Sequence, residues 1–95
     1  MLFYKFIIII TYMQQKDKEI LQNFGKHLKD IRSSKSKSLN KFVFEKGGIT
    51  TATLSRIENG LVDFKFTTLV KMASALNMTL SELLNEFDCK YEITD

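Results

Sequence analysis

Apolar residues recur at every third or fourth position in five stretches of this chain, which is the spacing of amphipathic α-helices. The longest stretch covers residues 17–34. Its apolar positions are Ile20, Leu21, Phe24, Leu28 and Ile31. The 95 residues include no proline and only four glycines, so few positions would interrupt a helix. The pattern therefore predicts one small all-α domain with a single core.

The second and third predicted helices are short and lie on either side of a glycine pair. Ser38 is a suitable N-cap for the helix LNKFVFEK, and the glycines at 47–48 end it because glycine readily adopts the left-handed conformation. Thr50 or Thr51 can cap the third helix, which Gly60 stops. Two short helices joined by a tight glycine-containing turn predict a helix-turn-helix, and the alternative is an ordinary hairpin in a helical bundle.

The fourth and fifth predicted helices follow a loop with the sequence LVDFKF. The fourth covers about residues 65–76, and the fifth covers residues 79–87. Thr79 and Glu82 have the spacing of a capping box at the start of the fifth helix.

Charge is unevenly distributed along the chain, although the net charge of +3 is modest. Lysine and arginine predominate over residues 26–46, whereas aspartate and glutamate predominate from residue 82 onward. Residues 88–95 form an acidic C-terminal tail. This distribution suits a domain that binds a polyanion with its basic end, or a set of simply solvated helices.

The sequence offers no pattern typical of an enzyme or a metal site. His27 is the only histidine, lies between lysines, and is expected to be a solvated surface residue. Cys89 is the only cysteine and cannot form an internal disulfide. Zinc-ligand spacing, a phosphate-binding loop and a nucleophile with a base partner are all missing. We therefore predict a protein that is not an enzyme and has no catalytic residues, metal or cofactor.

Residues 1–16 form an apolar N-terminal extension ahead of a domain at 17–87, and the extension begins MLFYKFIIIITYM. A transmembrane helix needs about 20 apolar residues, and Lys5 interrupts this short run. The segment also lacks the cleavage pattern of a signal peptide. Three alternatives are open: a dispensable prefix before a start at Met13, an exposed β-arm that pairs with a second chain, and a membrane or export role. We expect a prefix or an arm, a cytoplasmic location and no membrane contact.

In a helix-turn-helix the second helix of the motif lies in the major groove of double-stranded DNA, with its N-terminal side chains at the base edges. Four residues on the exposed side of the predicted third helix suit that position: Thr51, Ala52, Ser55 and Arg56. Arg56 can donate two hydrogen bonds to guanine, and the methyl groups of Thr51 and Ala52 can contact thymine. The hydroxyl of Ser38 and the charge of Lys41 would hold phosphates without reading sequence.

The segment TLSRIENG, with FGKHLKDIR upstream and TTLVKMASALNMTLSELL downstream, resembles the phage-repressor and Cro type (Xre) helix-turn-helix DNA-binding family. The resemblance runs from Phe24 to Leu84 and implies a five-helix lambda-repressor-like domain. Phe64 stands where the family usually has proline, so it is expected to pack on the domain or on a partner. In the second helix, either Phe42–Val43 or Val43–Phe44 matches the family's Leu-Ala. We prefer the first register because the alanine position has little room for phenylalanine.

The resemblance also implies roles for individual residues. The base-reading positions of the family fall on Thr51, Ala52 and Arg56. Other family positions usually touch the DNA backbone, and Asn40 falls close to one where the family commonly has glutamine. Ser38 and Lys41, suggested above as phosphate contacts, complete the set of residues predicted to contact the DNA backbone. The set is Ser38, Asn40, Lys41, Thr50, Ser55 and Asn59.

An arginine late in the first helix of the family pairs with the glutamate of the ENG motif, and these positions fall on Arg32 and Glu58. The resemblance implies a partly buried ion pair that ties the first helix to the end of the recognition helix. The alternative is two exposed charges that contribute little to stability.

Two hypotheses for function follow from these observations. The first is a transcriptional regulator that binds a near-palindromic operator as a homodimer, because one recognition helix reads too few base pairs for specificity. The second is an antitoxin-type module that binds a toxin partner and regulates its own operon. In that case the first helix and residues 85–95 would form the partner surface. The genes beside this one would distinguish the two.

Overall fold

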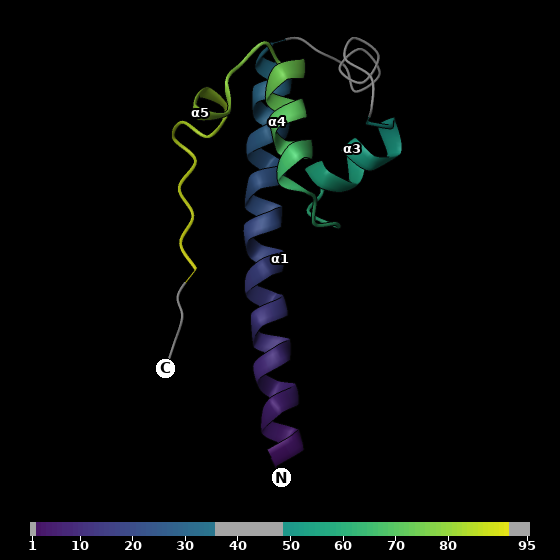
Figure 1. Ribbon diagram of the computed structural model, residues 1–95, viewed down its shortest axis with the longest axis vertical. Coiled ribbons are helices and arrows are strands. Elements are labelled where there is room, and N and C mark those ends of the chain that lie inside the picture. The colour runs from purple at the N-terminus through teal and green to yellow at the C-terminus, as the bar shows by residue number, and fades with distance from the viewer. Residues whose placement is uncertain (1, 36–48, 92–95) are drawn as a thin grey trace.

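The structure is a computed structural model that describes residues 2–35 and 49–91. It contains four α-helices in these ranges, and their order along the chain is α1 (Leu2–Ser34), α3 (Thr51–Glu58), α4 (Phe66–Ala75) and α5 (Leu80–Leu83) (Figure 1). The regular elements of the described residues are all helical, so the predicted all-α fold is confirmed. The second predicted helix lies outside the described residues, together with Ser38, Asn40 and Lys41.

Helix α1 begins much earlier than the sequence pattern predicts. Its C-terminal end at Ser34 agrees with the prediction, but its N-terminal end is at Leu2 rather than near residue 17. The β conformation proposed for the extension is therefore wrong. Adding residues to an existing helix requires no new nucleus, and isoleucine is less favourable than alanine by only a few tenths of a kcal/mol per residue. A strand, by contrast, would need a neighbouring strand, and the described residues of the protomer contain none.

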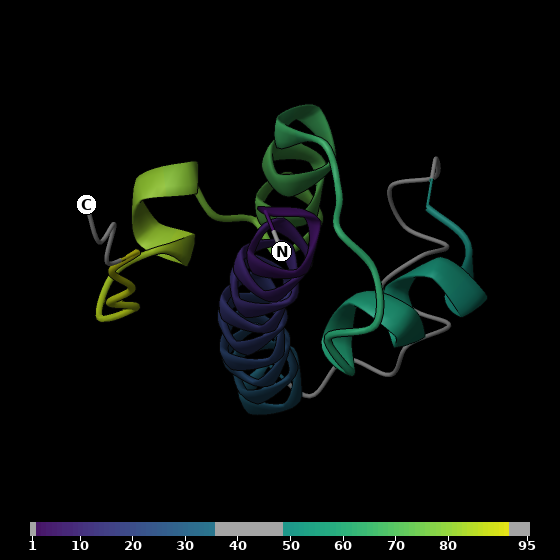
Figure 2. The same cartoon turned by 90° about the horizontal axis from the view of Figure 1, so that it is seen from below.

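The core lies where α3, α4 and α5 surround the C-terminal half of α1 (Figure 2). In Figure 2, α1 is seen almost end-on, with α3 on one side, α5 on the other and α4 above it in the view. Buried apolar side chains from all four helices, and from two residues just outside α3 and α4, meet at this position. They are Phe24, Leu28, Ile49, Leu54, Ile57, Met72, Ala73, Ala75, Leu76 and Leu83.

Two glycines allow α1 and the end of α3 to pack backbone against backbone. A Cβ atom on Gly25 would lie less than 3.0 Å from the carbonyl oxygens of Ile57 and Glu58, a separation that real Cβ atoms essentially never show. Gly60 has a φ of +70°, which is the left-handed conformation that favours glycine, and it abuts Gln22 of α1. The C-terminal end of α3 is therefore held directly against α1.

The last helix is shorter than predicted. Thr79 caps α5 and forms the predicted capping box with Glu82, in which each residue's side chain accepts a hydrogen bond from the other's backbone N–H. The helix ends at Leu83 and not near residue 87, and Glu86 adopts a φ of 64°. This turn brings the Phe87 ring to 5.6 Å from the Phe24 ring, measured between centroids. Packing on the core thus overrides the local helical pattern.

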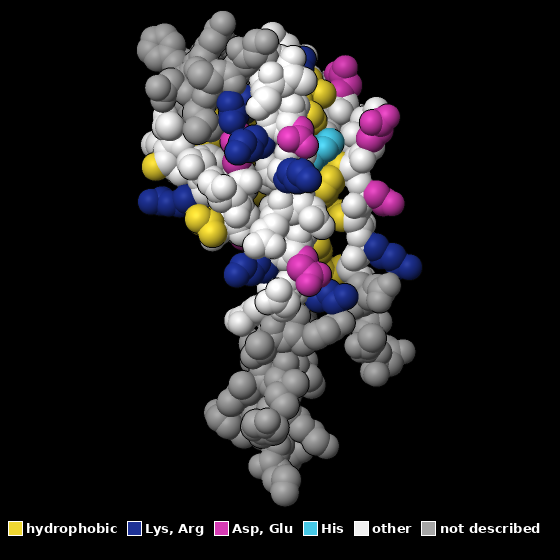
Figure 3. Space-filling view, turned by 180° about the vertical axis from the view of Figure 1, so that it is seen from behind, with side chains coloured by type: hydrophobic (Ala, Val, Ile, Leu, Met, Phe, Trp, Pro, Cys, Tyr) yellow, Lys and Arg dark blue, Asp and Glu magenta, His cyan; other side chains and the backbone are white. Residues whose placement is uncertain are grey.

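His27 is not the solvated residue that the sequence suggested. Its Nε2 atom lies 2.6 Å from the carbonyl oxygen of Leu83, and its ring stands 5.1 Å from that of Phe87 between centroids. Figure 3 shows hydrophobic side chains gathered between α1 and the C-terminal segment, where the histidine also lies. His27 therefore helps to hold α5 against α1.

Phe64 packs on the domain, which is one of the two expectations for this departure from the family pattern. Its ring is half-buried and lies 5.2 Å from the ring of Phe24 between centroids. The backbone N–H of Phe64, which a proline would lack, donates a hydrogen bond to the carboxylate of Asp63 at 2.8 Å. The loop between α3 and α4 is thereby tied to α1.

Candidate nucleic-acid interface

Helix α3 is the predicted recognition helix, and Thr50 is its N-cap. The Thr50 residue has the extended backbone of a cap, with φ −77° and ψ 156°, and its Oγ1 accepts a hydrogen bond from the N–H of Thr53. The same hydroxyl donates to Thr53 Oγ1 at 2.8 Å. Of the two predicted caps, Thr50 therefore fills the role and Thr51 is the first helical residue.

One side of α3 is buried and the other faces solvent. Leu54, Ile57 and Glu58 are its buried residues. The three predicted base-reading residues, Thr51, Ala52 and Arg56, are all exposed. Ser55 is half-buried beside them. The predicted base-reading residues thus share the outward side of one helix, as a groove contact requires.

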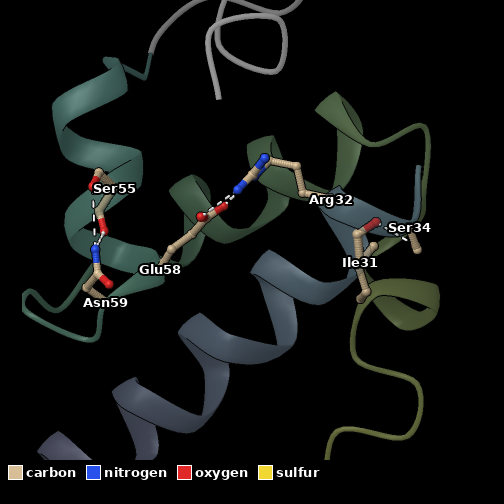
Figure 4. A network of polar contacts seen from close by, with 6 residues as sticks. All are labelled: Ile31, Arg32, Ser34, Ser55, Glu58 and Asn59. Atoms are coloured by element: carbon tan, nitrogen blue, oxygen red, sulfur yellow. Dashed lines mark hydrogen bonds and ion pairs between the residues drawn. The ribbon is translucent and has the colours of Figure 1, made fainter. Parts of the chain in front are cut away.

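Asn59 and Ser55 contact each other at the C-terminal end of α3 (Figure 4). Asn59 is the C-cap, and its side-chain Nδ2 donates a hydrogen bond to the Ser55 carbonyl oxygen at 2.8 Å. The same carbonyl oxygen also accepts the backbone N–H of Asn59 at 3.0 Å, so Asn59 closes the end of α3 with both its backbone and its side chain. A phosphate contact from Asn59 stays a prediction, and it would use the second N–H of the same amide.

Arg32 and Glu58 form a two-pronged ion pair between α1 and α3 (Figure 4). The Arg32 Nε atom lies 2.7 Å from Glu58 Oε2, and Nη2 lies 3.0 Å from Oε1. Each residue is only 8% exposed. The hydrogen bond to Glu58 raises the pKa of the Arg32 guanidinium, although burial alone would lower it. The pair restricts the rotation of α3 about its axis, because Glu58 is one of the buried residues of α3 and is bonded to α1.

Sequence reasoning missed the residues that position α3 through backbone contact. Gly25 lies in the middle of a predicted helix, where a glycine costs stability relative to alanine, and that is the signal that could have marked it. His27 gave no comparable signal, because its partner at Leu83 is 56 residues away.

No group of three or more histidine, cysteine, aspartate or glutamate side chains that could hold a metal ion occurs within residues 2–35 and 49–91. Over the same ranges, none of the helices combines the length and the apolar character needed to span a bilayer. Figure 3 shows lysine and arginine side chains interspersed with aspartate and glutamate on the face that it displays. That face therefore has no strong field of a single sign.

A sequence model of the Helix-turn-helix family matches residues 28–83, which is more than half of the chain. The chain belongs to this family. The family is Xre-like, as the residues around SRIENG implied, and its members are DNA-binding transcriptional regulators rather than enzymes. The match covers α3 and the Arg32–Glu58 pair.

A solved structure also resembles this protein. The crystal structure of the restriction-modification controller protein C.AhdI from Aeromonas hydrophila is 27% identical in sequence, with a TM-score of 0.62. The similarity covers 66% of this chain and 94% of C.AhdI. A search of curated proteins found no match. The fold similarity and the family together assign a double-stranded DNA-binding regulator.

Proposed function

We propose that this protein is a sequence-specific transcriptional regulator that binds a near-palindromic operator as a homodimer. The observation that carries the proposal is the division of α3 into two sides. Thr51, Ala52 and Arg56 face solvent, while Leu54, Ile57 and Glu58 are buried, with Glu58 bonded to Arg32 of α1. A helix fixed in this way can present the same three side chains to the major groove in every encounter.

Each of the three exposed residues has a defined role in this proposal. Arg56 donates two hydrogen bonds to the O6 and N7 atoms of guanine, a contact that discriminates by about 1–3 kcal/mol per base pair. Thr51 and Ala52 offer methyl groups to thymine. Thr50 and the first turn of α3 lie where the positive end of the helix would face a phosphate.

A homodimer follows from the size of one such contact. Three side chains near the start of a helix read only a few base pairs, and a second copy doubles the site. Two recognition helices read half-sites separated by about one helical turn, roughly 34 Å. The operator is then nearly palindromic because it mirrors the two-fold symmetry of the protein.

The test begins with selection of an operator from random duplexes by the wild-type protein. Arg56→Ala should then lose most of its preference for the selected duplex over a scrambled one, because it removes a base contact. Lys41→Ala should weaken binding to both duplexes alike, because it removes a predicted phosphate contact. Equal losses on both duplexes for Arg56→Ala would refute the base-reading role. Binding of the wild type should also fall steeply as the salt concentration rises.

The similarity to C.AhdI suggests which genes such a protein would regulate. C.AhdI is a restriction-modification controller, so restriction-modification genes are the first candidates for the operator search. The second function, an antitoxin that silences a toxin and regulates its own operon, shares the DNA-binding domain. Co-purification of the product of a neighbouring toxin-like gene in a fixed ratio would favour it. A neighbouring methyltransferase and endonuclease would favour the controller function.

A further inference from the structure

The chain after α5 turns back and runs along α1. Residues 84–91, which we call the strap, begin at the C-cap of α5 and extend beside α1 toward its N-terminal end (Figure 1). Most of the strap is exposed, and beyond Leu84 it packs on the core through Phe87. Segments with few buried contacts open more readily than the core of a domain. The strap can therefore open locally while the core stays folded.

The Phe87 ring is the main attachment of the strap. It lies 5.6 Å from the Phe24 ring between centroids, at an interplanar angle of 77°, and 5.1 Å from the His27 ring. Edge-to-face pairs at such distances attract each other beyond the effect of the apolar area that they bury. The hydrogen bond of 2.6 Å between His27 Nε2 and the Leu83 carbonyl oxygen holds the residue just before the strap. The closed position of the strap thus depends mainly on one aromatic ring.

The turn that brings Phe87 to α1 carries backbone strain. Glu86 adopts a φ of 64°, the left-handed conformation in which the Cβ atom of an L-residue is crowded by its own backbone. Opening of the strap relieves this strain, whereas it loses the contact of Phe87 with α1. Closure is therefore a balance between two opposing contributions, and a change in either one shifts the population of the closed state.

Phe24 lies between the strap and the recognition helix. It is 4% exposed, and its ring also contacts that of Phe64 at 5.2 Å between centroids. Phe64 belongs to the loop that follows α3. The next residue of α1, Gly25, abuts the carbonyl groups of Ile57 and Glu58 at the end of α3. The strap and α3 lie on opposite sides of α1 in Figure 2, so these α1 residues connect them.

We propose that the strap opens and closes on α1, and that its closure supports the end of the recognition helix through Phe24. When Phe87 leaves, Phe24 loses a neighbour, and the loop that carries Phe64 is held less firmly. The end of α3 then opens more often while the core stays folded. The inference rests on the proposed role of α3 as the recognition helix and does not depend on the homodimer.

Amide hydrogen exchange, followed by NMR in the full chain without DNA, measures the opening of the end of α3. The backbone N–H groups of residues 59–61 donate to carbonyls of α3 at 2.9 to 3.1 Å and report on this end. Phe87→Ala should accelerate their exchange about tenfold, a change within the range that linked packing residues produce. The N–H groups of Leu76 and Met78, at the far end of α4, should change by less than about twofold.

A variant of opposite sign tests the same balance. Glu86→Gly removes the left-handed strain from the closed strap, because glycine adopts this conformation readily, and should slow exchange at residues 59–61 about twofold. Glu86→Ala is its matched control, since it removes the same carboxylate but keeps the strain, and should not slow exchange. Lys90→Ala, a truncation at an exposed strap residue, is the control for Phe87→Ala and should leave exchange unchanged.

Coupling between two sites is reciprocal, so DNA that binds α3 should also act on the strap. Saturation with the selected duplex should slow exchange of the Phe87 N–H, which donates to the Leu84 carbonyl oxygen at 3.1 Å. The expected change is about fivefold. Since the strap lies across α1 from α3, the duplex does not shield this N–H directly (Figure 2). In Phe64→Ala the duplex should no longer slow this exchange, because the connection through Phe24 is broken.

Equal acceleration at residues 59–61 and at Leu76 and Met78 would overturn the proposal, because Phe87→Ala would then destabilise the whole domain. Unchanged exchange at residues 59–61, or a Phe87 N–H that does not respond to the duplex, would also overturn it. If Phe87→Ala does not fold, the comparison of Glu86→Gly with Glu86→Ala decides in its place. Failure to select any operator would instead refute the proposed function, and the experiments without DNA would still test the strap.

Discussion

Removing one member of the Arg32–Glu58 pair should cost a large part of the stability of this protein. Arg32→Met would leave the Glu58 carboxylate buried without its cation, and Glu58→Gln would leave the guanidinium facing a neutral amide. The structure gives two charge-assisted hydrogen bonds of 2.7 and 3.0 Å in a site where both residues are 8% exposed. Stranding a charge in such a site costs about 3–5 kcal/mol.

That loss is large relative to the total free energy of unfolding. A chain of 95 residues is expected to have roughly 5–14 kcal/mol of stability. In a domain of this size, each kcal/mol lowers the Tm by about 4–8 °C, so either variant should lose at least about 12 °C. The double variant has no stranded charge, and its loss should fall short of the summed single losses by about 1–3 kcal/mol.

Thermal and urea unfolding of the wild type, both single variants and the double variant measures these differences. Lys29→Met is the matched control, because it removes an exposed cation from the same helix and should change stability by no more than about 0.5 kcal/mol. Additive losses in the double variant would refute the coupling, as would an Arg32→Met variant no less stable than Lys29→Met. At a temperature where all variants are folded, DNA affinity should be almost unchanged, because Glu58 faces α1 and not the groove.

Two further predictions concern α1 and α5. Gly25→Ala should destabilise the protein by about 2 kcal/mol. The contact of the new Cβ atom with the backbone of Ile57 and Glu58 costs about 3 kcal/mol, and the higher helix propensity of alanine offsets about 1 kcal/mol of this cost. Urea unfolding measures this loss of stability, with Lys26→Ala at an exposed neighbouring residue as the control. A Gly25→Ala variant as stable as the wild type would show that α1 and α3 can move apart without cost. The hydrogen bond from the Thr79 backbone N–H lowers the pKa of Glu82. The ionised Glu82 carboxylate therefore stabilises the fold at pH values above its ordinary pKa of 4.5, and this contribution is lost as the pH falls through the lower pKa of the folded state. Tm measurements at pH 7 and pH 3 should show the wild type more stable than Glu82→Gln only at pH 7, and a pH-independent difference would contradict this reasoning.

Local signals in the sequence predicted the middle helices well. The predicted range 65–76 differs from α4 by one residue at each end, and Thr50 caps α3 as one of the two expected residues. Caps and turns depend on a few neighbouring side chains, so their positions can be inferred from short stretches. The capping box at Thr79 and Glu82 was predictable for the same reason.

Contacts between distant parts of the chain were harder to predict. Arg32 and Glu58 are 26 residues apart, and only the resemblance to a family paired them. Nothing in the sequence near His27 indicates a bond to the Leu83 carbonyl, because the partner is a backbone atom that any residue would supply. The end of α5 was missed because the φ of 64° at Glu86 is set by the packing of Phe87 and not by a glycine.

The arrangement of α3 separates the residues that support it from those proposed to read DNA. Its C-terminal half is held by the Glu58 ion pair and by the close approach of Gly25, both of which involve α1. Its N-terminal half presents Thr51 and Ala52 to solvent, one turn before Arg56. Substitutions at the supported end should therefore change the fraction of folded protein and affect all DNA sequences alike. Substitutions at the exposed residues should change the preference among DNA sequences while the folded fraction stays the same, so stability and specificity can be altered separately in this helix.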